Sequence, residues 1–323
     1  MPRIVRFYET GGPEVLRVED AIQHPRKDEV LLQVEAIGLN RADSMFMRGH
    51  FFERTRLPAC LGYEAAGVVK EVGAGVDPGW KGKRVSVIPA FSPNEYGTLG
   101  EEIVVAVHFL RAYPARLSAV EAAAIWVQYL TAYGSIVELG HIQRGDFVFI
   151  TAASGSAGLA AIETIRAEGG QSIAITRKSD KREELIALGA NHVIVSGEED
   201  IEACAAQITG GKGVRIILDW VARPLLPTLA NVAAPGGIII EYGALSEHPT
   251  PFPQLPVLSK CLTIRQLAGV NPAPAPAKDV PSQGEVAESG AGGPGAAARS
   301  AARRLQRPCL GHVSTPRYRK MAP

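Results

Sequence analysis

The sequence predicts an α/β protein in which a β-rich part precedes a doubly wound parallel sheet, followed by a disordered C-terminal tail. Three observations predict this. Residues 1–117 contain short β-rich segments separated by glycine and proline. Over residues 118–266, continuous apolar segments alternate with helical patterns, as expected when helices cover both faces of a parallel sheet. From residue 267 onward the chain is rich in Ala, Gly and Pro and contains no Ile, Phe or Trp, a composition that cannot offset chain entropy.

The β-rich part contains four segments whose composition is typical of strands. They follow one another closely and are bounded by turn residues, which predicts an all-β barrel or sandwich. The four segments are "EVLLQVEAIGLN" (29–40), "AAGVVKEVGAGV" (65–76), "GKRVSVIP" (82–89) and "GEEIVVAV" (100–107).

The second part opens with a helical segment, residues 118–140, for which Ser118 is the expected N-cap and Glu121 completes a capping box. Strands and helices then alternate, and Ser179 is the expected N-cap of the helix in "SDKREELIALGA". The expected strands are "DFVFITAA", "QSIAITR", "NHVIV", "VRIILDWV" and "IIIEYGAL", and the helices between them lie in "SAGLAAIETIRAEG", "SDKREELIALGA", "EEDIEACAAQITGG" and "PLLPTLANVAAPGG".

Composition and charge exclude several classes of protein. Of the 323 residues, 46% are hydrophobic and 21% are charged, which suits a globular protein with a substantial core. The net charge of +1 gives no field that would favour nucleic acid or an acidic partner. The four cysteines lie far apart and predict neither a disulfide framework nor a zinc finger. Because neither a signal peptide nor a membrane-spanning apolar run is visible, we expect a cytoplasmic protein.

The segment "ITAASGSAGLAAIETIRAEGG" (150–170) places small residues between a strand and a helix in the pattern AxxGxxG. The first small residue permits a tight turn, Gly155 lets a pyrophosphate approach the backbone, and Gly158 lets the helix pack against the strand. The free N–H groups of the helix start favour phosphate. An ordinary turn is the alternative, but the βα units that follow favour a dinucleotide-binding cradle. The cradle residues are Ala152, Ser154, Gly155, Ser156, Ala157 and Gly158.

The end of the next strand indicates which dinucleotide is bound. An NAD site usually carries an acid there, about 20 residues past the turn. This chain instead reads "TRKSDKR" (176–182), and Arg177 and Lys178 suit a 2′-phosphate through charge-assisted hydrogen bonds. A solvated basic helix start is the alternative, and we favour NADPH as the cofactor.

With these features the chain resembles the medium-chain dehydrogenase/reductase superfamily, and within it the zinc-independent quinone oxidoreductase branch of the zeta-crystallin type. The resemblance implies a GroES-like catalytic domain (1–117) and a Rossmann domain (118–266), with nicotinamide and substrate held between them. The segments that carry it are "AIGLNRADSMFMRG" (36–49), "LPACLGYEAAGVVKEVGAGV" (57–76), "GKRV" (82–85), "LTAYGSIVELGHIQRGDFVFITAASGSAGLAA" (130–161), "LGANHVI" (188–194) and "GGKGVRIILDWV" (210–221).

The resemblance also bears on zinc. Zinc-dependent relatives carry a cysteine at the position of Asn40 and a histidine at that of Tyr63, in a motif that here reads Gly62-Tyr63-Glu64. Neither asparagine nor tyrosine is a usual zinc ligand. The four-cysteine lobe of those relatives also has no counterpart, so we expect no metal site.

By the same resemblance, Asn40, Asp43 and Tyr63 face the nicotinamide and are the candidate catalytic residues. Asn40 is the expected hydrogen-bond donor to a substrate carbonyl. Asp43 could instead be a capping or supporting acid, and Tyr63 a proton donor or a packing residue. Phe51 and Phe52 could line an apolar acceptor pocket or serve core and lid packing.

For the cofactor, the resemblance adds Thr131, with its hydroxyl near the nicotinamide, and Gly243 after the last expected strand. Asp219 matches a family aspartate at a strand end, where its role could be structural. The cofactor would supply the hydride and the protein would orient the acceptor.

The expected function is therefore NADPH-dependent hydride transfer to a quinone or an α,β-unsaturated carbonyl without catalytic zinc. A cofactor-binding protein with little or no turnover is the alternative, because nothing after Gln266 matches the family's C-terminal catalytic segment. A zinc-type alcohol dehydrogenase is a third, disfavoured by Asn40 and Tyr63. The expected partner is the small-molecule acceptor, with no nucleic acid and no membrane, and a homodimer is compatible with the resemblance.

The tail (267–323) departs from the family, whose members return there to the catalytic domain. Its abrupt loss of Ile and Phe and its gain of Arg, Pro and Gly indicate a reading-frame change in the gene or its recorded sequence. The rival interpretation is a basic tail, free of acids from Arg299 onward, that binds RNA or an acidic partner. Translation of the coding DNA in the other two frames separates the two, because only a frame change predicts a family-like terminal strand there.

Overall fold

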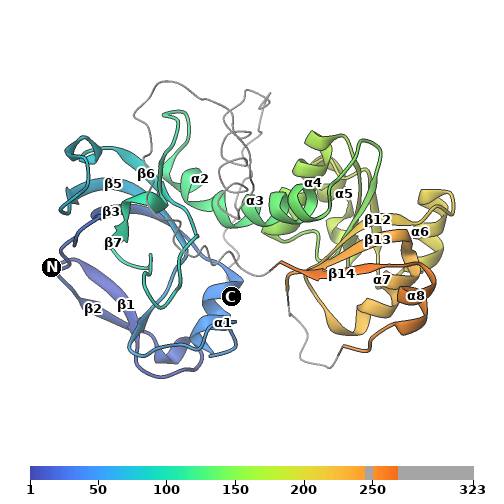
Figure 1. Cartoon of the computed structure of the whole chain (residues 1–323), viewed down its shortest axis with the longest axis horizontal. Helices are drawn as coiled ribbons and strands as arrows, with labels where there is room; N and C mark the ends of the chain where they lie inside the picture. The colour runs from blue at the N-terminus through green and yellow to red at the C-terminus, as the bar shows by residue number, and fades with distance from the viewer. Residues whose placement is uncertain (244–249, 268–323) are drawn as a thin grey trace. The chain divides into compact units, whose positions relative to one another are not determined.

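The structure is a computed structural model that describes residues 1–243 and 250–267, apart from the side chain of Arg223. Within these residues the chain forms a three-stranded and a five-stranded antiparallel sheet and a six-stranded parallel sheet (Figure 1). The predicted α/β fold is thereby confirmed. The predicted tail lies outside the described residues apart from Leu267. In the described part, no helix has the length and apolar character needed to cross a membrane.

The N-terminal part contains the two antiparallel sheets, ordered β2-β1-β4 and β7-β3-β5-β6-β8. The larger one packs the apolar side chains of β3, β5, β6 and β7 into one core. The strands are β1 (Arg3–Phe7), β2 (Arg17–Asp20), β3 (Glu29–Gly38), β4 (Ala59–Cys60), β5 (Glu64–Val72), β6 (Arg84–Val87), β7 (Glu102–Ala106) and β8 (Leu110–Ala112). Helix α1 (Arg41–Met47) follows β3, and 3-10 turns lie at η1 (Pro13–Val15), η2 (Pro78–Trp80) and η3 (Val107–Phe109).

The parallel sheet has the order β11-β10-β9-β12-β13-β14. The chain starts in the middle with β9, builds outward through β10 and β11, and then returns to add β12, β13 and β14 on the other side. The point between β9 and β12 is therefore the topological switch point, where ligands of open α/β sheets bind. The strands are β9 (Phe147–Ile150), β10 (Gln171–Thr176), β11 (His192–Val195), β12 (Val214–Asp219), β13 (Ala233–Glu241) and β14 (Thr263–Gln266).

Helices cover both faces of this sheet, which explains why its strands are continuously apolar. Val148 and Ile150 of β9 pack in one core with Ile162 of α4, whereas Phe149 between them packs with Leu229 of α7 in the other. Figure 1 shows α4 and α7 on opposite sides of β12 and β13. The helices and 3-10 turns are α4 (Ser156–Glu168), η5 (Ser179–Lys181), α5 (Arg182–Ala187), α6 (Ile201–Thr209), η6 (Arg223–Leu225), α7 (Leu226–Val232) and α8 (Gln254–Ser259).

The segment predicted as one helix over residues 118–140 is divided in the structure. It forms α2 (Ala119–Ala124), α3 (Trp126–Tyr133) and a π-helical segment η4 (Gly134–Leu139). The beginning follows the prediction, because Ser118 caps α2 and Glu121 closes the capping box.

The break between α2 and α3 has a visible cause. In a continuous helix the Trp126 N–H would donate to the Ala122 carbonyl, four residues earlier. Here the Trp126 N–H donates to the Glu64 carboxylate at 3.1 Å, and the Ala122 carbonyl accepts from the Ser86 hydroxyl at 2.9 Å. Side chains of β5 and β6 thus take both partners of one helical hydrogen bond.

The expected cap at Ser179 is wrong. Ser179 begins the 3-10 turn η5, and its hydroxyl donates to Glu198 at 2.9 Å. Helix α5 begins three residues later, with Lys181 in the N-cap position. A long-range partner, 19 residues away along the chain, has taken the hydroxyl that local pattern assigned to the helix start.

Candidate functional site

The loop after β9 and the start of α4 form one continuous small-residue turn. Ala152 adopts a left-handed backbone with φ of 47°, a conformation that most residues avoid. The Gly155 N–H donates back to the Ala152 carbonyl at 3.0 Å, and Gly155 is the N-cap of α4 with no side chain capping the helix. The first-turn N–H groups of a 13-residue helix therefore stay available to a ligand. All six predicted cradle residues lie on this turn: Ala152, Ser154, Gly155, Ser156, Ala157 and Gly158.

The two glycines of the cradle have different surroundings. A Cβ on Gly158 would lie 2.4 Å from the Ala153 carbonyl oxygen, so the helix packs directly onto the loop at this point. A Cβ on Gly155 would meet its nearest atom, the Ala152 carbonyl oxygen, at 3.4 Å, and Gly155 is exposed. Packing within the protein thus requires a glycine at 158, whereas position 155 is open on the side where a ligand would approach.

A hydrogen-bond network joins the cradle to the neighbouring strand at the switch point. The Thr151 hydroxyl donates to Asp219 Oδ1 at 3.0 Å and accepts from the Trp220 N–H at 2.9 Å. The same Asp219 oxygen accepts from the N–H groups of Val221 and Ala222, both at 3.0 Å. Asp219 is fully buried, and these bonds support the structural role that the sequence left open for it.

The end of β10 carries the basic residues predicted to select the nucleotide. Arg177 and Lys178 directly follow the buried Thr176 and are exposed. The next two basic residues are engaged, because Lys181 pairs with Glu184 at 3.1 Å and Arg182 with Glu199 at 2.5 Å.

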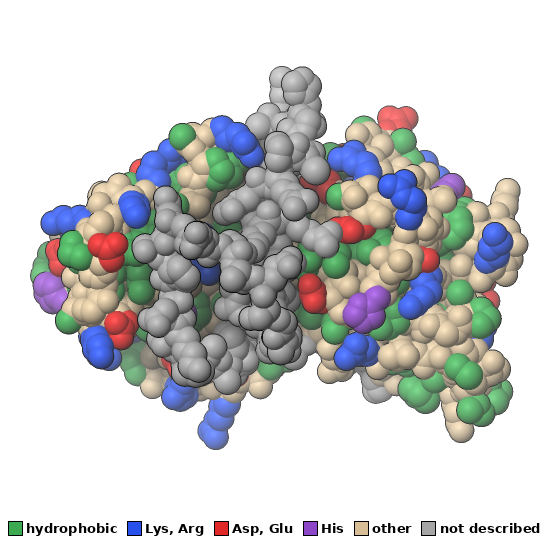
Figure 2. All heavy atoms as spheres, turned by 45° about the horizontal axis from the view of Figure 1, so that its top comes forward, with side chains coloured by type: hydrophobic (Ala, Val, Ile, Leu, Met, Phe, Trp, Pro, Cys, Tyr) green, Lys and Arg blue, Asp and Glu red, His purple; other side chains and the backbone are tan. Residues whose placement is uncertain are grey.

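Within the described residues, neither Arg177 nor Lys178 has an ion-pair partner, so both are free to meet an anion. On the face drawn in Figure 2, basic, acidic and apolar side chains are interspersed over the described surface.

Thr131 and Gly243 lie on other elements. Thr131 is inside α3 and only 5% exposed. Gly243 follows β13, and a Cβ there would lie 1.9 Å from the Trp220 carbonyl oxygen. The chain after β13 thus passes directly over the end of β12, at the same edge of the sheet as Asp219.

Asn40 and Asp43 form the start of α1. Asn40 is the N-cap, and the Asp43 carboxylate accepts from the backbone N–H of Asn40 at 2.8 Å and from that of Gly62 at 3.0 Å. Burial raises the pKa of Asp43 to about 6, against the two backbone hydrogen bonds that lower it. Asp43 therefore ties α1 to the Gly62-Tyr63-Glu64 segment.

Tyr63 contributes a buried hydroxyl that has no hydrogen-bond partner among the described residues. The side chain is 8% exposed, and its ring lies near Phe51 and Phe91, with centroids 6.0 and 6.1 Å away. Burial, followed by the negative charge of Asp43, raises its pKa, so the hydroxyl stays protonated. An unpartnered buried donor is costly, and a ligand that accepts a hydrogen bond would satisfy it.

Of the two aromatic residues predicted for an acceptor pocket, Phe51 contacts Phe46 and Tyr63 with centroid distances of 6.1 and 6.0 Å. Phe52 is 65% exposed. Its ring contacts that of Phe51, with centroids 4.7 Å apart, so Phe51 lies against the Tyr63 ring and Phe52 lies on the exposed side of Phe51.

Sequence reasoning did not select Glu64, although it lies in the same motif. Glu64 is 3% exposed, and its carboxylate accepts from the Asn40 side chain at 3.0 Å and from the backbone N–H groups of Trp126 and Val127 at 3.1 and 2.9 Å. Burial raises its pKa to about 7. A charged residue at the head of the apolar strand "EAAGVV" was the available signal.

No group of three or more His, Cys, Asp or Glu side chains that could hold a metal ion occurs among residues 1–243 and 250–267. The cysteines of this part, Cys60, Cys204 and Cys261, are free thiols.

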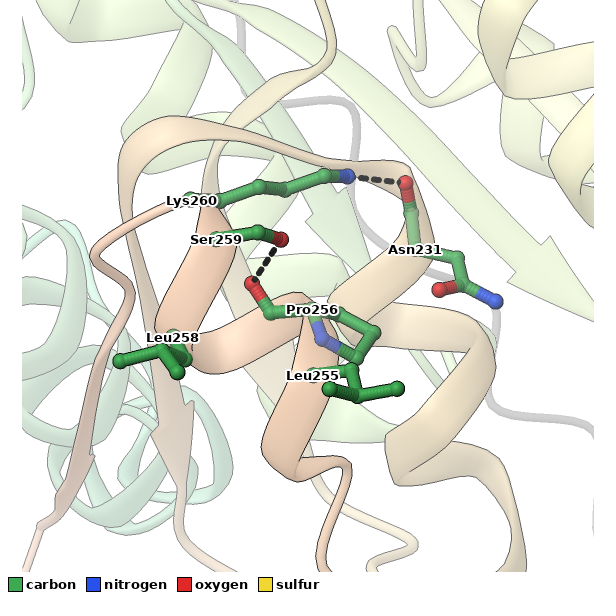
Figure 3. A pocket seen from close by; sticks show the side chains of 6 residues that line it. All are labelled: Asn231, Leu255, Pro256, Leu258, Ser259 and Lys260. Atoms are coloured by element: carbon green, nitrogen blue, oxygen red, sulfur yellow. Dashed lines mark hydrogen bonds between the residues drawn. The ribbon is translucent and has the colours of Figure 1, made fainter.

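A surface pocket of about 360 Å³ lies elsewhere, between α7 and α8 (Figure 3). Its only charged lining residue, Lys260, donates to the backbone carbonyls of Ala230, Asn231 and Ala233 at 3.2, 2.5 and 2.9 Å. The ammonium group thereby caps the end of α7 and has a structural role. None of the predicted site residues lines this pocket.

Two parts of the chain match known protein families. Residues 26–115 match the alcohol dehydrogenase GroES-like domain, and residues 157–280 match the zinc-binding dehydrogenase family. The second match ends beyond Gln266, the last residue of the expected Rossmann domain.

Individual proteins similar to this chain are quinone oxidoreductases. Human quinone oxidoreductase is 30% identical over 244 residues, covering 75% of this chain and 73% of that protein. Quinone oxidoreductase 1 of Escherichia coli is 31% identical over 244 residues, 74% of this chain and 72% of that protein. The crystal structure of an E. coli quinone oxidoreductase complexed with NADPH matches with a TM-score of 0.79 at 26% identity, covering 94% of this chain and 86% of that one.

Proposed function

Because this chain belongs to the quinone oxidoreductase-like branch of the medium-chain dehydrogenase/reductase superfamily, we propose that it uses NADPH to reduce a quinone or an α,β-unsaturated carbonyl. The observation that carries the proposal is the Tyr63 hydroxyl, a buried donor without a partner in the described part of the chain. Tyr63 stands in the motif Gly62-Tyr63-Glu64, in which the Gly62 backbone N–H donates to Asp43 of α1.

The cofactor half of the proposal rests on the cradle and on two free cations. The open side of Gly155 and the uncapped start of α4 suit a pyrophosphate, and Arg177 and Lys178 suit a 2′-phosphate. When bound there, NADPH supplies the hydride. The E. coli relative complexed with NADPH supports this choice over NADH.

The acceptor half rests on hydrogen-bond donors. As a hydride reaches the ring or double bond of such an acceptor, negative charge gathers on its carbonyl oxygen, and donors aimed at that oxygen lower the barrier. The Tyr63 hydroxyl, kept protonated by burial, is one donor, and the Asn40 carboxamide is the second. Asp43 supports both because its carboxylate holds the backbone beside each of them.

Zinc does not fit this site, although the matched C-terminal family is described as zinc-binding. The two positions at which zinc relatives supply ligands carry Asn40 and Tyr63, and neither side chain is a usual zinc ligand. The proposed reaction therefore has no metal step.

The test replaces Tyr63 by phenylalanine and uses Tyr113→Phe as the matched control. Both hydroxyls are buried and lack partners among the described residues. The Tyr113 ring, however, lies under Arg84 and packs with alanines of α2, whereas the Tyr63 ring lies near Phe51 and Phe91. With NADPH and a quinone or an enone, we expect Tyr63→Phe to lower kcat about 100-fold, the loss typical of one oxyanion donor. Tyr113→Phe should keep full turnover, and both variants should melt within about 2 °C of the wild type.

Three outcomes would contradict the proposal. Equal turnover of both variants would remove Tyr63 from the reaction. NADPH binding without oxidation by any quinone or enone would favour the cofactor-binding protein without turnover. Loss of activity on treatment with a chelator would restore the zinc-type alcohol dehydrogenase.

A further inference from the structure

Glu64 occupies a place that the surrounding backbone reserves for it. It is the first residue of β5 and lies directly opposite Gly38 of β3 in the antiparallel register. A Cβ on Gly38 would lie 2.5 Å from Glu64 Oε1 and 2.7 Å from the Ala123 carbonyl oxygen. A glycine in β3 therefore makes the space in which this carboxylate lies.

The two carboxylate oxygens of Glu64 have separate partners. Oε1 accepts from Asn40 Nδ2 at 3.0 Å. Oε2 accepts from the backbone N–H groups of Trp126 and Val127, the first two residues of α3, whose own N-cap Ile125 offers no side-chain hydrogen bond. One carboxylate thus caps the helix that carries Thr131 and holds the amide of Asn40.

The chemistry of the Oε1 contact fixes the orientation of the amide. An ionised carboxylate only accepts hydrogen bonds, so Asn40 must turn its Nδ2 toward it. A neutral partner that donates would require the reverse, with Asn40 Oδ1 facing position 64. The backbone of Asn40 is held separately by Asp43, so the carboxamide can turn without moving α1.

We infer that Glu64 is a positioning residue: its carboxylate takes one N–H of Asn40 Nδ2 and thereby fixes where the second N–H of that nitrogen is offered to the acceptor. The inference rests on the proposed function, in which Asn40 is a donor to the acceptor oxygen. The two roles of Glu64 are independent, because Oε2 can accept from the first N–H groups of α3 in either orientation of the Asn40 amide.

The charges around Glu64 make the contact responsive to protons. Burial raises the pKa of Glu64 to about 7, and Asp43 of α1 is the charged side chain that adds to this effect. The other elements in contact, β3 and the α2–α3 junction, present Gly38, the Ala123 carbonyl and two backbone N–H groups, which do not titrate.

The decisive variant is Glu64→Gln. Its Oε1 can still accept from Trp126 and Val127, but its Nε2 donates, so Asn40 must turn its Oδ1 inward. An oxygen lone pair then stands where the second N–H of Asn40 Nδ2 was offered to the acceptor. We expect kcat with NADPH and a quinone to fall about 10- to 100-fold, as for other groups that orient a functional residue. The KM for the quinone and the melting temperature should stay close to the wild-type values. Glu29→Gln is the control, because this carboxylate also accepts from a side chain and a backbone N–H, those of Tyr96 and Arg26.

A double-mutant cycle separates positioning from a structural role. If Glu64 acts through Asn40, Glu64→Gln should cause no further loss of kcat in an Asn40→Ala background. An equal loss in both backgrounds would overturn the inference.

A spectroscopic measurement tests whether Glu64 orients the Asn40 amide, even if the protein has no turnover. The Asn40 side-chain amide signals in a ¹⁵N–¹H spectrum should shift with a midpoint near pH 7 in the wild type and in Glu29→Gln. In Glu64→Gln this step should be lost, leaving only the shift that Asp43 causes near pH 6. Absence of this titration in the wild type would sink the inference. Titration without oxidation of NADPH by any acceptor would instead refute the proposed function and leave the positioning intact.

Discussion

The cradle yields a sharp prediction for Gly158→Ala. The added Cβ would lie 2.4 Å from the Ala153 carbonyl oxygen and 2.6 Å from both Ala153 C and Cα. All three atoms belong to the backbone, so no flexible side chain can yield. Overpacking of this kind costs about 1–3 kcal/mol. The position is buried, and we take about 2–3 kcal/mol, which lowers the melting temperature by about 5–10 °C in a chain of this size.

The assay compares Gly158→Ala with Gly155→Ala by thermal unfolding without cofactor and by titration with NADPH. At Gly155 the nearest atom to a new Cβ is 3.4 Å away, and alanine in place of glycine at an N-cap costs under about 1 kcal/mol. We expect Gly155→Ala to melt near the wild type yet to bind NADPH more weakly, because the Cβ occupies the open side of the cradle. The reasoning is refuted if Gly158→Ala melts with the wild type, or if Gly155→Ala binds NADPH unchanged.

Three further predictions concern other parts of the sheet and the motif. Joint replacement of Arg177 and Lys178 by alanine should raise the Kd for NADPH about 10- to 100-fold, the value of charge-assisted hydrogen bonds, and leave that for NADH nearly unchanged; Lys181→Ala, which breaks only an ion pair with Glu184, is the control. Thr151→Val removes two buried hydrogen bonds between the cradle and β12, and should lower the unfolding free energy by about 1–3 kcal/mol in urea titrations. Because folding raises the pKa of Glu64 from 4.5 to about 7, its contribution to stability is present below pH 4.5 and lost as the pH rises through 7. Over that range the wild-type melting temperature should therefore fall more steeply than that of Glu64→Gln, and parallel curves would contradict the assignment.

The local sequence pattern was sufficient to predict those features of the structure that depend on residues close together along the chain. The parallel strands are continuous apolar runs, and the capping box at Ser118 joins residues three positions apart. The cradle likewise lies within one strand–turn–helix unit. Each of these features was predictable from the sequence because each is decided within a few residues.

Features that depend on distant partners were missed. Glu64 meets Asn40 24 residues earlier and Trp126 62 residues later, so nothing in its own segment shows that it caps α3. The same contact divides the predicted helix, since it removes a donor from the helical ladder. Ser179 failed as a cap for the same reason, because Glu198 takes its hydroxyl. Strands β1, β2 and β4 are two to five residues long and pair across the chain, and their composition gives little sign of it.

The side chains of β9 point alternately to the two cores of the parallel sheet, and this limits which mutations the strand tolerates. Phe149 points to one core and its neighbours Val148 and Ile150 to the other. At each position one apolar residue can therefore replace another of similar volume at a modest cost in stability. A deletion of a single codon is different in kind. It would swap the two sets of side chains between the cores and draw the turn at Ala152 back from Asp219. Among homologues, the length of the segment from the start of β9 to Gly155 should therefore vary less than the identity of any residue in it.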